Sequence, residues 1–160
     1  MDYSKSVGGA ALGARLRRLS EAIDRDATRA YATLGIRFEQ RWFGVLNQLA
    51  INGPMSVSEL ATALRITRAS VSQTRQSLED GGLIEAEAHP LDARQRHLML
   101  TTAGSRLIRR LEPLWDAMNE AALELNAEAG NVVGALDRLD EALARQALFD
   151  RIMARLSRDD

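Results

Sequence analysis

The side chains best suited to specific recognition lie between Thr67 and Leu78. This stretch contains Arg68, Gln73 and Gln76 and has no acidic residue, although 27% of the chain is charged. A glutamine can make two hydrogen bonds to the edge of an adenine, and an arginine can make two to a guanine. A polar surface without acids also suits a polyanion, because phosphates repel carboxylates. The stretch therefore predicts contact with double-stranded DNA.

Helical spacing divides the same stretch into two faces. Val71, Thr74 and Leu78 recur at intervals of three and four residues, so they should face inward. The residues expected to contact DNA are Arg68, Ala69, Ser72, Gln73 and Gln76 on the outer face, with Thr67 and Ser70 at the helix start.

Five of these seven residues have a chemically suitable partner on DNA. Gln73 suits an adenine, Arg68 a guanine or a phosphate, and the methyl group of Ala69 a thymine. Thr67 and Ser70 lie among the free amides of the helix start and suit phosphate oxygens. The alternative interpretation of these polar residues is an ordinary solvated helix face.

A second cationic site is expected after Pro90, where Asp92, Arg94 and Arg96 follow one another. Pro90 and Asp92 favour a loop, with both arginines in or beside it and Asp92 placed to hold one of them. An arginine can enter a narrow minor groove, where the negative potential of DNA is enhanced. The alternative is a surface ion pair that contributes ~0 to 1 kcal/mol.

Two helix starts position the first group of residues. Ser56 and Glu59 have the spacing of a capping box, in which each side chain satisfies a backbone amide of the other. Thr67 is the next candidate N-cap. The two helices would be joined by a sharp turn at residues 65–66, and Gly81-Gly82 would end the second helix.

Strand signals follow the second helix. Residues 83–88 and 97–100 can each run as a strand on either side of the loop that Pro90 and Asp92 open, which predicts a β-hairpin. Thr101 or Thr102 would then cap a further helix.

Apolar stripes at helical spacing occur toward both ends of the chain. They comprise Leu12, Leu16, Leu19, Ile23, Ala27, Ala30 and Leu34, then Leu107, Leu111, Leu114, Met118, Ala122 and Leu125, and finally Val132, Leu136, Leu139, Leu143 and Ala147. Leu148, Ile152 and Leu156 continue the last stripe after a shift of phase. One small lobe cannot cover this much apolar surface, so burial against a second copy is favoured over an intramolecular bundle.

Composition excludes several classes of function. The chain has no cysteine, its only lysine is Lys5, and its only histidines are His89 and His97. Thiol chemistry, a zinc–thiolate site and a lysine-containing phosphate loop are thereby excluded. Two histidines in the predicted hairpin supply too few ligands for a metal. We therefore expect no metal, no cofactor and no enzymatic activity, and the catalytic set is empty.

The expected location is the cytoplasm. The longest apolar run falls far short of the roughly 20 residues that a membrane helix requires. The sequence does not open with the pattern of an export signal. The lack of cysteine agrees with a reducing compartment.

Six short motifs together resemble the MarR family of bacterial transcriptional regulators. They are Val57-Ser58-Glu59-Leu60-Ala61, Val71-Ser72, Leu78-Glu79, Gly82-Leu83, Asp92-x-Arg94 and Leu100-Thr101-x-x-Gly104. The resemblance implies a mainly α fold with a small β-hairpin wing, and a repressor that binds an inverted-repeat operator as a homodimer. Residues 67–80 would be the recognition helix, and residues 85–100 the wing, whose tip arginine is Arg94 and which Asp92 shapes.

The same resemblance organises the chain as a single domain, residues 1–160. Residues of about 10–35 and 102–157 would form the dimerisation helices, and residues of about 38–101 the winged helix-turn-helix lobe. In this family a small molecule often binds in a cleft beside the lobe. Candidate lining residues for an aromatic effector are Tyr31, Phe38, Trp42, Phe43, Trp115 and Met118. The alternative is that these side chains belong to the core.

The charge of the lobe departs from the family pattern. Between Ser56 and Thr101 there are five arginines (65, 68, 75, 94, 96) and six acids (59, 79, 80, 85, 87, 92), which gives a net charge of −1. Because phosphate neutralisation supplies much of DNA affinity, binding should be modest and salt-dependent. Flanking arginines that could offset the deficit are Arg15, Arg17, Arg18, Arg37 and Arg41. The deficit leaves open two alternatives, a dimeric interaction module that does not bind DNA and a protein that sequesters a small ligand.

Overall fold

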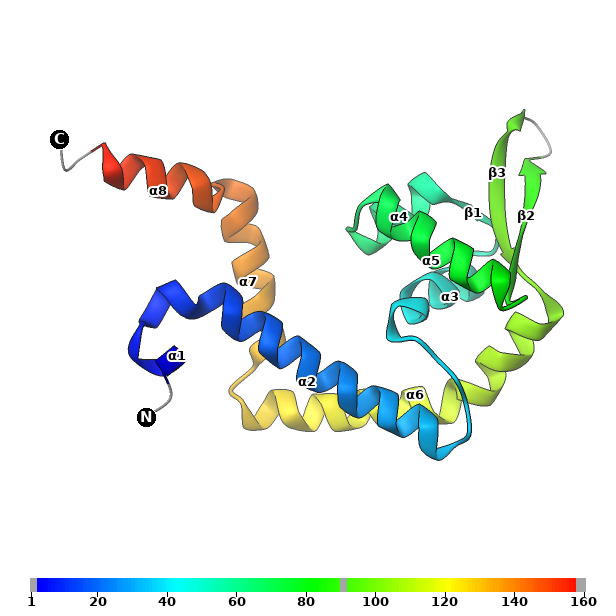
Figure 1. Cartoon of the computed structure of the whole chain (residues 1–160), viewed down its shortest axis with the longest axis horizontal. Helices are drawn as coiled ribbons and strands as arrows, with labels where there is room; N and C mark the ends of the chain where they lie inside the picture. The colour runs from blue at the N-terminus through cyan, green and yellow to red at the C-terminus, as the bar shows by residue number, and fades with distance from the viewer. Residues whose placement is uncertain (1–2, 90–91, 158–160) are drawn as a thin grey trace. The chain divides into compact units, whose positions relative to one another are not determined.

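The protein is mainly helical with one small antiparallel sheet (Figure 1). The structure is a computed structural model that describes residues 3–89 and 92–157, and the side chains at positions 4, 5, 88, 89 and 92–95 are not described. Its elements are α1 (Tyr3–Ser6), the 3₁₀ turn η1 (Gly8–Ala11), α2 (Leu12–Thr33), α3 (Gln40–Asn52), β1 (Met55–Ser56), α4 (Val57–Leu64), α5 (Arg68–Asp80), β2 (Ile84–His89), β3 (Asp92–Leu100), α6 (Thr102–Glu128), α7 (Val132–Arg145) and α8 (Leu148–Leu156).

The chain divides into two compact units, Met1–Leu114 and Trp115–Asp160. Helix α6 begins in the first unit and ends in the second. Pro113 lies inside α6 next to the boundary, where its ring removes one backbone donor from the helix.

The two helix starts form as predicted. The Ser56 hydroxyl accepts from the Glu59 amide at 3.2 Å, and the Glu59 carboxylate accepts from the Ser56 amide at 2.7 Å, so α4 begins with a complete capping box. Thr67 caps α5 by accepting from the Ser70 amide at 3.1 Å. Between them, Arg65 adopts a left-handed conformation with φ of 54°. That single residue makes the sharp turn between the two helices.

The sheet has the strand order β1-β3-β2 and is antiparallel throughout. In the register, Ile84 pairs with Leu100, and Met55 pairs with Leu98. The return strand is longer than the predicted run of residues 97–100, because it already begins at Asp92. Strand β1 was not predicted, since two residues are too few to show an alternating pattern.

The core of the first unit joins α2 and α3 to the helix-turn-helix and the sheet. Its fully buried side chains include Tyr31, Val45, Leu46, Leu60, Val71, Leu78, Leu98 and Leu111. Among the residues that the structure describes, every buried apolar side chain lies in this unit. The first unit therefore has a hydrophobic core of its own.

A tight joint connects the base of the wing to α6. Helix α5 ends at the glycine pair, as predicted. Gly81 keeps right-handed helical backbone angles, and Gly82 adopts the left-handed conformation with φ of +65°. The Thr101 hydroxyl donates to the Gly82 carbonyl at 2.7 Å and accepts from the Gly104 amide at 3.0 Å. Of the two candidate caps for α6, Thr101 is the one that the structure uses.

The second unit is built from the end of α6, α7 and α8. Asn131 takes φ of 64° and caps α7 by accepting from the Gly134 amide. Helix α7 ends where Gln146 becomes extended, so the shift of phase after Ala147 marks a break between two helices. Arg151 of α8 donates to the carbonyls of Ala142 at 2.9 Å and Gln146 at 3.1 Å.

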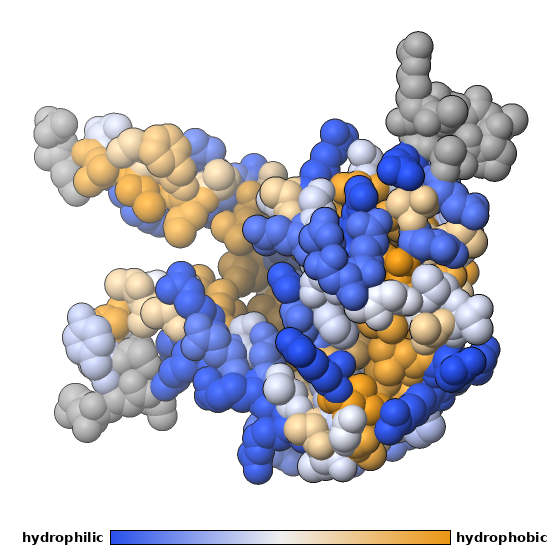
Figure 2. Space-filling view, turned by 45° about the vertical axis from the view of Figure 1, so that its right-hand side comes forward, coloured by the Kyte–Doolittle hydropathy of each residue, from blue (hydrophilic) through white to orange (hydrophobic). Residues whose placement is uncertain are grey.

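Apolar side chains remain exposed along α2 and along the helices of the second unit. Figure 2 shows such surface on the C-terminal helices at the upper left of the view. The exposed residues of the predicted stripes are Leu12, Leu16, Leu19, Ile23, Leu34, Leu125, Val132, Leu136, Leu143, Leu148, Ile152 and Leu156. Helices α7 and α8 contain no buried residue.

None of the helices within residues 3–89 and 92–157 is both long enough and apolar enough to cross a membrane.

Candidate DNA-binding surface

Helix α5 presents the two faces that its sequence predicts. Val71 and Leu78 are completely buried, and Thr74 is 4% exposed. The opposite side carries Arg68, Ala69, Ser72, Gln73 and Gln76, all of which are exposed, and Thr67 and Ser70 at the helix start are exposed as well. All seven predicted contact residues of this segment are therefore accessible.

The hydroxyl groups at the start of α5 are already partnered within the helix. Thr67 Oγ1 lies 2.8 Å from Ser70 Oγ, and it also accepts from the Ser70 amide. Both groups keep the solvent exposure that a phosphate contact requires. Their mutual hydrogen bond fixes the first turn of α5.

The acidic residues at the end of α5 interact with side chains of the same helix. Gln76 Nε2 donates to Asp80 Oδ1 at 2.8 Å, and Arg75 Nε donates to Glu79 Oε1 at 3.0 Å. Both pairs have the i, i+4 spacing that brings side chains together on a helix. Asp80 therefore orients Gln76, one of the predicted DNA contacts, and Glu79 partly neutralises the charge of Arg75.

The wing consists of β2 and β3. Arg96 is exposed and lies in β3, as does the backbone of Arg94, so both arginines follow the loop in the return strand. The strand extends to Asp92 because the hairpin pairing continues to the His89–Asp92 pair. The side chains of Asp92 and Arg94 lie outside the described part of the chain, as does Pro90. Glu85 and Glu87 of β2 are exposed and add negative charge to the wing.

The wing contacts the start of the helix-turn-helix through His97. His97 Nε2 of β3 lies 3.9 Å from Glu59 Oε2, the carboxylate that completes the capping box of α4. Ser56 and His97 also pair directly between β1 and β3. Among the described side chains, no group of three or more His, Cys, Asp or Glu residues is placed to hold a metal ion.

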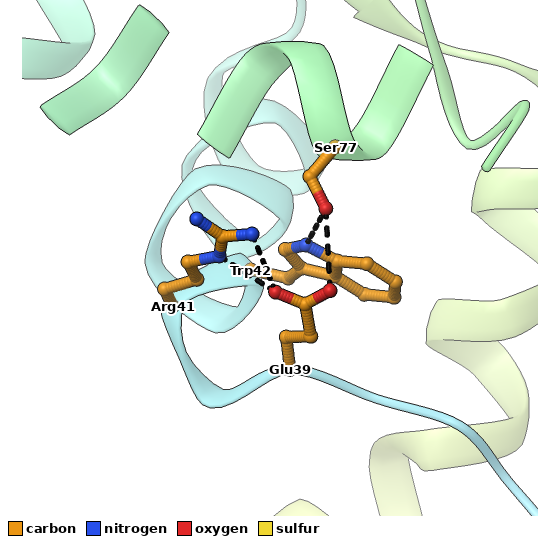
Figure 3. Close-up of polar contacts among 4 residues, drawn as sticks. All are labelled: Glu39, Arg41, Trp42 and Ser77. Carbon is orange, nitrogen blue, oxygen red and sulfur yellow. Dashed lines mark hydrogen bonds and ion pairs between the residues drawn. The ribbon is translucent and has the colours of Figure 1, made fainter. Parts of the chain in front are cut away.

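A polar network links α5 to the start of α3 (Figure 3). Trp42 Nε1 donates to Ser77 Oγ at 3.1 Å, and Ser77 Oγ donates to Glu39 Oε1 at 3.3 Å. Arg41 binds the other oxygen of Glu39 through Nε and Nη2, both at 2.7 Å. The contact between Glu39 and Ser77 could not be predicted from the sequence, because the two residues are far apart in the chain and no spacing links them. The sequence also indicates Arg41 as a candidate phosphate contact, but the structure shows that its guanidinium is paired with Glu39.

The predicted effector residues fall into two groups. Tyr31, Phe38 and Trp42 are buried in the first unit, and their rings are in contact. The ring centroids of Tyr31 and Phe38 are 4.4 Å apart, and those of Phe38 and Trp42 are 5.6 Å apart. Phe43 is partly buried in the first unit, and Trp115 and Met118 are partly buried in the second.

A capped helix pair with an exposed second helix, preceded by β1 and followed by a hairpin that completes a three-stranded sheet, defines a winged helix-turn-helix protein. A model of the MarR family matches residues 35–95, which span α3 to the beginning of β3. A protein of Thauera aromatica named as a transcriptional regulator for the hcr operon is 32% identical over 131 residues, covering 80% of this chain and 78% of that protein.

Solved structures show the same fold. The transcriptional repressor CouR bound to a 23-mer DNA duplex aligns with a TM-score of 0.62 and 29% identity, over 85% of this chain and 92% of that one. Bordetella bronchiseptica BpsR, whose DNA binding is regulated by 6-hydroxynicotinic acid, aligns with a TM-score of 0.69 and 21% identity, over 81% of this chain and 92% of that one. This chain therefore belongs to the MarR family of transcription regulators, which bind DNA and are not enzymes.

Proposed function

We propose that the protein is a cytoplasmic homodimeric repressor that binds an inverted-repeat operator. The observation that supports this most is the row of exposed apolar side chains on α2, α7 and α8, because contiguous exposed apolar surface marks interaction sites. Two copies related by a two-fold axis would bury equivalent stripes and present two recognition helices. Two such helices read half-sites about one helical turn apart, and the inverted repeat of the operator matches the symmetry of the protein.

Within each half-site, α5 would enter the major groove. Arg68, Gln73 and Gln76 are long, exposed side chains with the donors and acceptors that base edges require. Arg94 would reach the flanking minor groove, with Arg96 near the phosphates. The repressor role has support from CouR, a repressor with the same fold.

We also propose a response to a small aromatic molecule. BpsR, which shares the fold, responds to such a compound. The candidate contacts within the first unit are the partly buried Phe43 and the ring cluster of Tyr31, Phe38 and Trp42, while Trp115 and Met118 of the second unit stay sequence predictions. A ligand of this kind should alter the affinity for DNA, and titration of aromatic acids into a protein–DNA complex tests this.

Fluorescence anisotropy across a salt series tests the central proposal. The probes are a labelled duplex from the region upstream of the protein's own gene and a scrambled duplex of the same composition. We expect tight binding to the upstream duplex alone, with the logarithm of affinity falling steeply as salt rises. Equal and weak binding to both duplexes would contradict the proposal and would favour an interaction module or a ligand-sequestering protein.

A further inference from the structure

Ser77 occupies a distinct position on the recognition helix. It lies between the buried face of α5, formed by Val71, Thr74 and Leu78, and the exposed face that carries the predicted base contacts. Its side chain is partly buried and faces the segment that begins α3 (Figure 3). None of the DNA-contact assignments above uses this residue.

The hydroxyl of Ser77 makes two hydrogen bonds of opposite sense. It accepts from Trp42 Nε1 at 3.1 Å and donates to Glu39 Oε1 at 3.3 Å. Hydrogen bonds weaken when the angle or the distance departs from the ideal, whereas apolar contacts are non-directional. The apolar face of α5 therefore fixes how closely the helix packs, and the two polar contacts fix its rotation about its own axis.

Both partners of Ser77 are themselves held in place. The ring of Trp42 is 7% exposed and meets Phe38 edge-on, and Phe38 in turn contacts Tyr31 of α2. Glu39 is anchored through its second oxygen by Arg41. A continuous series of contacts thus runs from α2 through the aromatic cluster to α5, within a single compact unit.

We propose that Ser77 is a positioning residue for DNA recognition, and that Trp42, Ser77 and Glu39 set the rotation of α5 so that Gln73 and Gln76 meet the base edges. A displacement of the aromatic cluster would be passed to the recognition helix by the same contacts. This inference rests on the proposed function, because it requires sequence-specific DNA binding by α5.

The test compares specific with non-specific binding. The specific probe is a duplex selected from a random-sequence pool by the wild-type protein, and the non-specific probe is its scrambled counterpart. Ser77→Ala should weaken binding to the selected duplex about three- to tenfold, the loss expected for net hydrogen-bond contributions, and leave the scrambled duplex unaffected. Ser77→Thr keeps the hydroxyl and should restore specificity. Ser105→Ala on α6 is the matched control and should behave as wild type.

Two further measurements separate positioning from a general loss of structure. In a Trp115→Phe background, Trp42 is the only tryptophan, and its emission should change in Ser77→Ala but not in Ser105→Ala. Trp42→Phe removes the N–H donor and keeps an aromatic ring. Combined with Ser77→Ala, it should cost no more specificity than Ser77→Ala alone, because that change already removes the acceptor of the Trp42 N–H.

The outcomes distinguish the inference from the function on which it rests. If the wild-type protein does not prefer its selected duplex, the proposed function fails and the inference falls with it. If the wild type is specific and Ser77→Ala is equally specific, only the inference is wrong. An equal loss on both duplexes, a failure of Ser77→Thr to restore specificity, or additive losses in the double variant would also overturn it.

Discussion

At the scale of single residues, the joint between the wing and α6 depends on the absence of one side chain. A Cβ atom at Gly104 would overlap the backbone carbonyl of Leu83, which has little room to move because the Thr101 amide donates to it at 3.1 Å. Thr101 also caps α6 at the Gly104 amide. The Leu100-Thr101-x-x-Gly104 motif therefore has a packing and capping role, which is separate from DNA contact.

Gly104→Ala should consequently destabilise the protein by about 1 to 3 kcal/mol, the usual cost of overpacking a close contact. Thermal unfolding followed by circular dichroism measures the effect. Gly13→Ala is the matched control, because a Cβ there meets no atom within 4 Å and the residue lies in a helix with ordinary backbone angles. Equal melting temperatures for the two variants would show that the joint tolerates the methyl group.

Gln73 gives the most direct test of base reading. Its side chain is exposed on the outer face of α5. Gln73→Ala should cost ~1 to 3 kcal/mol at one base position and spare non-specific binding. Affinities for a set of operators with single base substitutions locate that position. A uniform loss across all duplexes would make Gln73 a phosphate-positioning residue.

At the scale of elements, the wing has the form expected of a groove-binding hairpin but carries mixed charge. Arg96 is exposed on β3, whereas Glu85 and Glu87 are exposed on β2. The acids oppose phosphate attraction, so the arginines must supply most of the favourable electrostatic contribution of the wing.

Arg94→Ala should therefore weaken binding to every duplex. It should also reduce the slope of log affinity against log salt concentration by about 1, the amount expected for one lost phosphate contact. Anisotropy titrations at several salt concentrations measure both quantities. Gln95→Ala, at the neighbouring position, is the control and should leave the slope unchanged. If Arg94→Ala keeps the wild-type slope, the wing does not approach the phosphates.

The corner between α7 and α8 depends on one arginine. Arg151 donates to two carbonyls at the end of α7, the last of which, Gln146, is already extended. A cation at the end of a helix satisfies free carbonyls and interacts favourably with the helix dipole. Without it, α8 would no longer be held at a fixed angle to α7.

Arg151→Ala should accordingly weaken self-association without preventing it, provided that α8 contributes apolar surface to the dimer. Sedimentation velocity over a concentration series measures the dimer dissociation constant. Arg155→Ala removes a neighbouring exposed arginine of the same helix and serves as the control. An unchanged dissociation constant in Arg151→Ala would show that the corner does not matter for assembly.

Elements defined by local hydrogen bonds could be predicted from the sequence, and those defined by distant partners could not. The caps at Ser56 and Thr67 involve residues three apart, so their spacing is visible in the chain. Strand β1 exists because it pairs with Leu98 and His97, some forty residues away, as the register shows. The contact between Glu39 and Ser77 is likewise set by tertiary packing, and the start of β3 at Asp92 depends on its pairing with β2.

At the scale of the whole molecule, the first unit has its own core, whereas no apolar side chain is buried in the described part of the second, residues 115–157. Helices α7 and α8 have no buried residue, yet apolar side chains repeat along both at helical spacing. A helix with such a stripe is stable in a folded protein only when the stripe is covered. Between the two predicted alternatives, self-association has the stronger physical support, because a dimer also doubles the recognition surface.

Leu143 offers the clearest test of this arrangement. It lies on the apolar stripe of α7 and is 44% exposed in the single chain. A carboxylate placed there would have to be desolvated in the dimer, at a cost of several kcal/mol. Leu143→Asp should therefore give monomers in light scattering after gel filtration, together with loss of operator binding. Arg138→Asp places the same carboxylate on an exposed position of α7 off the stripe and should remain dimeric. Persistence of the Leu143→Asp dimer would place the interface on other helices, with α2 as the next candidate because its apolar stripe is also exposed.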